Sequence, residues 1–205
     1  MGLIGMQASF FTDTYIWQGN YGIKQYKTGD QVDANTLFMI ASCSKPVTAL
    51  AILKLQEAGK LGLDDPVNDH IPFQVANPNF PDELITIRML LTHTSSIRDN
   101  WEILYPLYTL PEGGDSSLTL TYFLSEYLLE SGELYDREEN FWNDKPESLF
   151  QYCNVGYALL GLIIEKVTGM TFKEFIDEEV FVPLRMDQTY WFLADIPHRN
   201  IARPH

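Results

Sequence analysis

The chain has 205 residues, of which 45% are hydrophobic and 13% aromatic, a composition that favours a packed globular protein over a disordered one. With 14 Lys and Arg against 28 Asp and Glu, its formal net charge is −14. Nucleic-acid backbones and anionic membranes both reward positive charge, so this balance argues against either as a partner.

The first forty residues predict strands and turns. Two β-prone runs, Gln7–Phe11 and Tyr15–Trp17, flank the turn-forming residues 12–14, a pattern typical of a hairpin. The glycines that follow are expected to interrupt regular structure, and they are Gly19, Gly22 and Gly29.

A helix is predicted from about Ser42 to Gln56, with a broad apolar face and a stop signal at Gly59. Pro46 is tolerated only in the first turn of a helix, so the helix must begin close before it. That places Ser42 at the helix N-terminus. Free backbone N–H groups and the helix dipole favour negative charge there, including that of a developing oxyanion.

Loops and one short helix are expected next. Residues 60–85 contain four prolines and indicate a surface loop, after which Thr86 caps a short helix that ends at Leu91. Residues 92–117 are predicted to be irregular because Pro106, Pro111, Gly113 and Gly114 interrupt them.

Helices dominate the rest of the chain. One is predicted over about Leu118–Glu130, ended by Gly132. The segment Val155–Thr168 is apolar nearly all round, which predicts a buried helix stopped by Gly169. A capping box, residues 171–174, opens a further helix to about Glu179.

The tetrad Ser42-Cys43-Ser44-Lys45 holds a hydroxyl and an amine three residues apart, a spacing that brings both to one helical face. Serine needs an adjacent base to act as a nucleophile, and a lysine kept neutral one turn away can be that base. Taken alone, Ser42 is more often a helix N-cap. The structural alternative for Lys45 is a solvated first-turn lysine.

Further segments place the tetrad in context, and they are Phe38–Ala41, Pro46–Ala49, Glu57–Val67, Leu90–Ser95 and Tyr152–Tyr157. In this order they resemble the serine β-lactamase and penicillin-binding-protein superfamily. The likeness, from about Gly5 to Thr189, is greatest to the branch of class C β-lactamases, D-Ala-D-Ala carboxypeptidases and related esterases. It implies an α+β, β-lactamase-like fold. The chain would be a single incomplete domain, with strands in residues 1–40 and a mostly helical region in residues 41–205.

The resemblance also implies roles for four residues. Ser42 matches the acylated nucleophile, Lys45 the amine beside it and Tyr152 the tyrosine of a Tyr-x-Asn motif. Asn154 matches the amide that orients the lysine and the substrate carbonyl. The implied protein is a serine hydrolase or acyltransferase that forms an acyl-enzyme on Ser42 with a β-lactam, a D-Ala-D-Ala peptide or an ester. No cofactor and no metal are implied.

The base is either Lys45 or Tyr152. Lysine and tyrosine side chains both titrate at about 10 in model peptides; burial lowers a lysine pKa, and nearby positive charge lowers a tyrosine pKa. We expect the two to act as a coupled pair that shares a proton. The backbone N–H of Ser42 is expected to form half of an oxyanion hole. The structural alternatives are a core aromatic for Tyr152 and a helix cap for Asn154.

Several aromatic residues follow the tetrad. His93 is expected to pack and order its loop rather than to act as a base, since no Asp partner is evident in the sequence. Trp101, Tyr105 and Tyr108 lie in the segment predicted to be irregular. They either line a substrate cleft or pack a long loop.

The chain departs from the family at three places. Ser96 and Glu147 stand where the family usually has glycine, which puts the local loop geometry in question. A third motif, a Lys or His followed one residue later by Gly, does not occur after Phe192. We therefore expect a truncated, inactive fragment, and the alternative function is a non-catalytic member that binds a ligand or partner.

The last expectations concern the compartment, membrane spans and the two cysteines. The resemblance implies a periplasmic, cell-envelope or secreted setting, although no Lys or Arg precedes Lys24, so the N-terminus does not predict a signal peptide. The longest apolar stretch, Tyr157–Ile164, is too short to span a bilayer. Cys43 and Cys153 are expected to be small buried hydrophobic residues rather than a disulfide.

Overall fold

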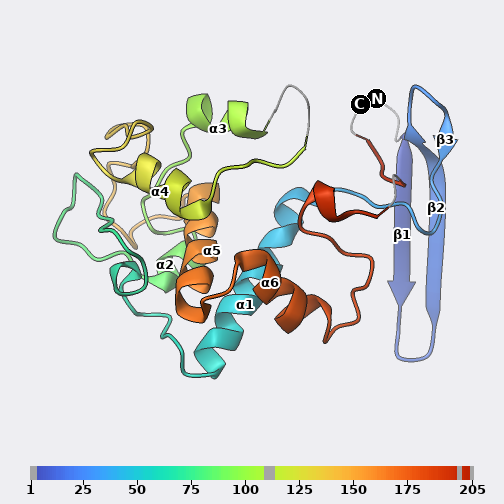
Figure 1. Ribbon diagram of the computed structural model, residues 1–205, viewed down its shortest axis with the longest axis horizontal. Helices are drawn as coiled ribbons and strands as arrows, with labels where there is room; N and C mark the ends of the chain where they lie inside the picture. The colour runs from blue at the N-terminus through green and yellow to red at the C-terminus, as the bar shows by residue number, and fades with distance from the viewer. Residues whose placement is uncertain (1–3, 109–113, 198–199, 204–205) are drawn as a thin grey trace. The chain divides into compact units, whose positions relative to one another are not determined.

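The computed structural model describes residues 4–108, 114–197 and 200–203 (Figure 1). The chain forms two compact units, one made of Met1–Cys43 with Asp195–His205 and the other of Ser44–Ala194. Pro111 and Gly113 of the expected irregular segment lie outside the described residues. The expectation that everything belongs to a single incomplete domain stays a prediction.

The predicted hairpin is confirmed. Strand β1 (Gly5–Phe11) pairs antiparallel with β2 (Ile16–Gln25), and the short strand β3 (Asp30–Gln31) pairs with β2. β2 is longer than predicted because it continues through both of its glycines. At Gly22, where φ is +73°, an added Cβ would lie 1.9 Å from the carbonyl oxygen of Ile4. Glycine here allows two strands to approach closely and does not end the strand.

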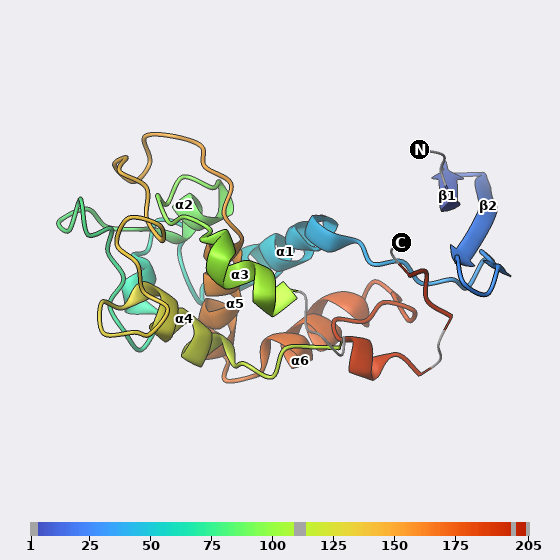
Figure 2. The same cartoon turned by 90° about the horizontal axis from the view of Figure 1, so that it is seen from above.

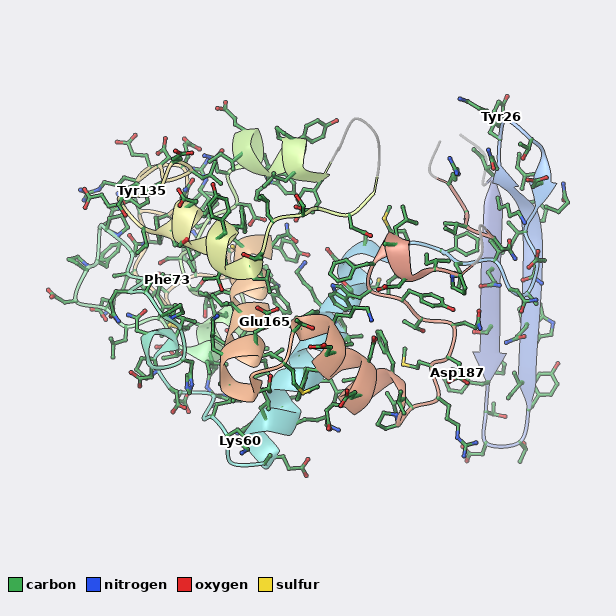
Figure 3. The ribbon with its side chains drawn as sticks, viewed as in Figure 1. Tyr26, Lys60, Phe73, Tyr135, Glu165 and Asp187 are labelled. Carbon is green, nitrogen blue, oxygen red and sulfur yellow. The ribbon has the colours of Figure 1, made fainter. Side chains whose placement is uncertain are left out.

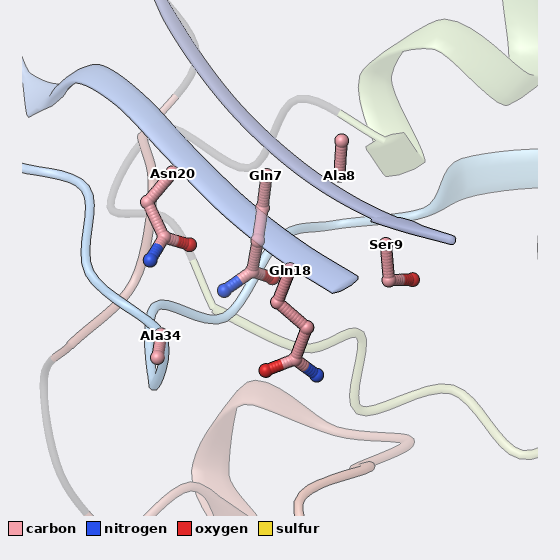
Figure 4. Close-up of a pocket in the computed structure, with 6 residues that line it drawn as sticks. All are labelled: Gln7, Ala8, Ser9, Gln18, Asn20 and Ala34. Atoms are coloured by element: carbon pink, nitrogen blue, oxygen red, sulfur yellow. The ribbon is translucent and has the colours of Figure 1, made fainter. Parts of the chain in front are cut away.

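The two faces of this hairpin differ in polarity, because residues paired directly across two strands lie on the same face. The pairs on one face are Met6–Tyr21, Ala8–Gly19 and Phe10–Trp17. Those on the other are Gly5–Gly22, Gln7–Asn20 and Ser9–Gln18, with the apolar pair Phe11–Ile16 only at the hairpin end. A pocket of about 140 Å³ lies beside the polar pairs, lined by Gln7, Ala8, Ser9, Gln18, Asn20 and Ala34 (Figure 4). Phe10, Trp17 and Tyr21 on the apolar face are exposed.

The C-terminal residues join the strands, although the sequence placed them with the helical region. Leu37 and Ile201 form a parallel bridge. The Asn200 side chain accepts a hydrogen bond from Lys24 Nζ at 2.7 Å and donates to the Asp33 carboxylate at 3.0 Å. These bonds join residues more than 160 positions apart, so no local sequence pattern indicates them.

The second unit is helical. Its helices are α1 (Lys45–Glu57), α2 (Ile87–Leu91), α3 (Trp101–Tyr108), α4 (Leu120–Leu128), α5 (Asn154–Thr168) and α6 (Phe172–Ile176), and a π-helical turn over Asp177–Phe181 follows α6. Helix α5 packs against α1, α2, α4 and α6 (Figures 1 and 2). The predicted buried helix is therefore confirmed, and it is the centre of this unit's core.

Caps and stop signals define most of these helices as predicted. Thr86 and Thr171 accept N–H bonds at the starts of α2 and α6, and Glu174 completes the capping box. Helix α5 ends at Gly169, which has the left-handed conformation with φ +73°. Glu165 on α5 accepts the N–H of Phe172 at 3.0 Å and so ties α5 to α6 (Figure 3).

Two loop predictions are wrong in part. Residues 60–85 are not only surface, because they contribute Leu61, Val67, Ile71, Val75 and Ile85 to the core. Residues 101–108 form helix α3 with Pro106 inside it. The Asn100 side chain accepts the N–H of Glu102 at 3.2 Å and supports the first turn of this helix.

Among the described residues, no single helix is long and apolar enough to cross a membrane. Helix α5 and the segment Phe172–Phe181 reach the required length and apolarity only as a pair, which is bent by 83°.

Candidate active site

Ser42 lies in a 3-10 turn, Ala41–Ser44, that runs directly into α1. The predicted helix start at Ser42 is therefore early, since α1 begins at Lys45 with Pro46 in its first turn. The N-cap is Ser44, so the structure does not support the alternative that Ser42 caps this helix. Ala41, just before Ser42, has a φ of +45°, a strained value for a residue with a Cβ.

Lys45 contacts the Tyr-x-Asn segment. Its Nζ donates to Asn154 Oδ1 at 2.7 Å and lies 4.8 Å from the centre of the Tyr152 ring and 5.4 Å from that of Tyr157. Segments about one hundred residues apart in sequence thus place an amine, an amide and a phenol ring together. The geometry combines a charge-assisted hydrogen bond with cation–π contacts.

Tyr152 and Asn154 stand at the start of α5. The N-cap of this helix is Cys153, whose sulfur accepts the N–H of Gly156 at 3.3 Å, and Asn154 is the first helical residue. The cap role considered for Asn154 is therefore filled by its neighbour. Tyr152 is 45% exposed, so it is not the core aromatic of the structural alternative.

Asp99 is the site residue that the sequence did not reveal. Its carboxylate accepts the backbone N–H of Asn154 at 2.8 Å, that of Val155 at 3.0 Å and the Asn154 side-chain amide at 2.7 Å. The thiol of Cys153 also donates to it at 3.3 Å. In the sequence, its only sign is an Asp shortly after His93, a feature too common to single out.

His93 orders the segment before α5, in line with the structural role expected of it. Its Nδ1 accepts the N–H of Cys153 at 3.1 Å, and its ring lies 4.5 Å from that of Tyr152 and 5.0 Å from that of Tyr157. Burial lowers the pKa of His93, and the nearby charge of Lys45 lowers it further. The accepting Nδ1 and the lowered pKa both indicate a neutral imidazole.

This pKa shift predicts a pH-dependent contribution to stability. The unfolded chain binds a proton at His93 below about pH 6.5, whereas the folded protein resists doing so, and stability therefore falls as pH drops from about 6.5 towards the lower folded pKa. His93→Asn keeps an acceptor and suits the φ of +59°. Urea unfolding at about pH 7.5 and about pH 5.5 should show a smaller loss in this variant than in the parent. An equal loss in both proteins would contradict the assignment.

The two positions where the resemblance implies glycine, Ser96 and Glu147, both have positive φ angles. Ser96 has a φ of +60° and Glu147 a φ of +74°, both in the left-handed region. Backbone hydrogen bonds join the two segments. The N–H of Trp142 donates to the carbonyl oxygen of Ser96, and the N–H of Glu147 donates to the carbonyl oxygen of Thr94. Both residues therefore hold a backbone conformation that favours glycine, at the cost of local strain.

The aromatic residues of the expected irregular segment lie on α3. Trp101, Tyr105 and Tyr108 are all more than half exposed, and the rings of Trp101 and Tyr108 lie 6.0 Å apart. Partial burial of the phenol and the nearby negative charge of Asp99 raise the pKa of Tyr108.

The cysteines form no disulfide. Cys43 is exposed, contrary to the expectation, and Cys153 is buried as expected. Burial also raises the pKa of Cys153, and its thiol serves as a helix cap. Within the described parts of the chain, no group of three or more His, Cys, Asp or Glu side chains is arranged to hold a metal ion.

Comparison with known proteins adds independent evidence. A family model described as Beta-lactamase matches residues 1–205. Penicillin-binding protein 4* of Bacillus subtilis is 32% identical over 174 residues, which are 85% of this chain and 35% of that protein.

Two solved structures are also similar. An octameric penicillin-binding protein homologue from Pyrococcus abyssi has a TM-score of 0.77 and 29% identity, over 97% of this chain and 43% of that one. A penicillin-binding protein from Bacillus halodurans has a TM-score of 0.71 and 28% identity, over 97% of this chain and 55% of that one. This chain spans only about a third of the length of the Bacillus subtilis protein. The chain belongs to the β-lactamase family and has its α+β fold, within the superfamily of serine β-lactamases and penicillin-binding proteins.

Proposed function

We propose that this chain carries the acylation site of a serine hydrolase, with Ser42 as the nucleophile. The observation that supports this most is the bond of 2.7 Å between Lys45 Nζ and Asn154 Oδ1, with Tyr152 beside the same amine. The proposed substrates are a β-lactam, a D-Ala-D-Ala peptide or an ester.

The proposed reaction proceeds in two steps. The pair formed by Lys45 and Tyr152 takes the proton of the Ser42 hydroxyl, while the Ser42 oxygen forms a bond to the carbonyl carbon of the substrate. The backbone N–H of Ser42 donates to the resulting oxyanion. Collapse breaks the bond to the leaving nitrogen or oxygen, which receives the proton, and an ester on Ser42 remains. Water then hydrolyses this acyl-enzyme.

The substrate contacts are proposed from the elements around this group. The Asn154 side chain donates a hydrogen bond from Nδ2 to Asp99, so the carbonyl end of the same amide faces Lys45. In this orientation Asn154 holds the Lys45 amine in place for the substrate. Trp101 and Tyr105 are exposed on α3, where they offer an apolar wall for a substrate side chain. By resemblance, we propose a periplasmic, cell-envelope or secreted setting, which cell fractionation would test.

A covalent probe tests this function. A fluorescent penicillin or a fluorophosphonate should be applied both to the 205-residue chain and to the full product of the coding sequence that contains it. We expect the full product to be labelled, with labelling lost in Ser42→Ala and kept in Ser44→Ala, a control two residues away. The 205-residue chain, expected to be inactive, should be labelled little or not at all. Trp101→Ala and Tyr105→Ala should weaken labelling by apolar probes while leaving Ser42 the labelled residue.

The alternative, a non-catalytic binding member, makes the opposite prediction. Neither form of the protein would then be labelled, and penicillin would at most raise the melting temperature without forming a covalent adduct. Labelling that persists in Ser42→Ala would show that the reactive group is another residue.

A further inference from the structure

We infer that Asp99 is a positioning residue of this site: its carboxylate determines which end of the Asn154 side-chain amide faces Lys45. The inference rests on the proposed function, because the amine being positioned is the proposed partner of Ser42. The chain of contacts is continuous. Asp99 Oδ2 accepts from Asn154 Nδ2 at 2.7 Å, and Asn154 Oδ1 accepts from Lys45 Nζ at 2.7 Å.

The chemistry of the three groups selects this orientation. A carboxylate only accepts hydrogen bonds, the Lys45 amine donates one to Asn154, and an amide has one end of each kind. If the Asn154 amide turned over, its NH₂ group would face the Lys45 amine and its oxygen would face the Asp99 carboxylate. Both contacts would then be repulsive. The carboxylate therefore holds the amide oxygen towards Lys45 without touching the amine itself.

Asp99 is held rigidly enough to do this. Its oxygens also accept the backbone N–H groups of Asn154 and Val155, at the positive end of the α5 dipole. The thiol of Cys153 supplies a fourth donor. Because these contacts cap α5, loss of Asp99 must also affect stability, and a test has to separate the two effects.

A double-mutant cycle separates them. Asp99→Asn keeps the size of the side chain but replaces two acceptor oxygens with one, too few for four donors. We expect it to slow probe labelling of Ser42 by about tenfold, the loss of roughly one hydrogen bond to a charged group. In an Asn154→Ala background the same change should slow labelling by less than about twofold, because the amide it orients is gone. The melting temperature should fall in both backgrounds, because the contacts with the backbone N–H groups are lost in each.

Two control variants reproduce the side effects of Asp99→Asn, which are the loss of a negative charge and the loss of a helix cap. Asp64→Asn removes one negative charge from an exposed ion pair with Arg88, and Thr171→Ala removes the cap of α6. Neither should change the labelling rate of the folded protein. Equal slowing by Asp99→Asn with and without Asn154 would overturn the inference, because a cap alone would act in that way.

Failure of the proposed function would be recognised separately, as absence of labelling in the parent protein. The inference is then decided by NMR on the same variants. The side-chain NH₂ signals of Asn154, assigned by their loss in Asn154→Ala, should shift and exchange faster in Asp99→Asn but not in Asp64→Asn. Unchanged signals would overturn the positioning role whether or not the protein is an enzyme.

Discussion

Replacing Lys45 with Met is expected to slow acylation of Ser42 by about 10²–10⁴-fold, the usual contribution of a positioned general acid–base group. Methionine has similar length and can still pack against the rings of Tyr152 and Tyr157. It cannot take a proton or donate to Asn154 Oδ1, which is the bond of 2.7 Å that defines the group. The change should therefore affect the chemistry more than the fold.

The measurement is the second-order rate of probe labelling across a pH series, with melting temperature recorded in parallel. Lys54→Met is the matched control, since this lysine is on the same helix and pairs with Glu179 instead. The same labelling rates are measured for a second variant, Tyr152→Phe. If Lys45 and Tyr152 share a proton, this variant should be slower and should have a different pH–rate profile. A Lys45→Met rate within about threefold of the parent, or an unchanged profile in Tyr152→Phe, would contradict the paired-base proposal.

Truncating Ile163 to Ala is expected to lower the free energy of unfolding by about 2–5 kcal/mol. This side chain is 0% exposed on α5, the helix that packs against α1, α2, α4 and α6. Its removal leaves a cavity that fixed neighbours on several helices cannot easily fill. The loss is large compared with the stability of an ordinary domain, about 5–15 kcal/mol.

Urea unfolding checks this prediction against a matched control. Leu53→Ala removes a side chain that is 46% exposed on α1, and its cost should be below about 1 kcal/mol. Similar losses in the two variants would mean that α5 is not the centre of the core in solution. A large loss confined to Ile163→Ala would support the packing described above.

Local pattern was sufficient for much of this protein. The hairpin, the capped starts of α2 and α6, and the buried helix α5 with its stop at Gly169 all follow from residues close together in sequence. The motif residues Lys45, Tyr152 and Asn154 were also identified from the sequence, through a resemblance to the family to which the chain belongs. Their catalytic roles remain predictions.

The tertiary structure alone revealed Asp99, helix α3 and the return of Asn200 to the strands. Asp99 acts through bonds to residues about 55 positions away, and Asn200 through bonds to residues more than 160 positions away. Helix α3 forms with Pro106 inside it, although proline normally signals a break. Periodicity and capping report contacts within one turn of a helix or across one hairpin, so bonds between distant segments leave no trace in them. The residue types that can hold the amine were therefore readable from the sequence, whereas the carboxylate that orients them was decided by the fold.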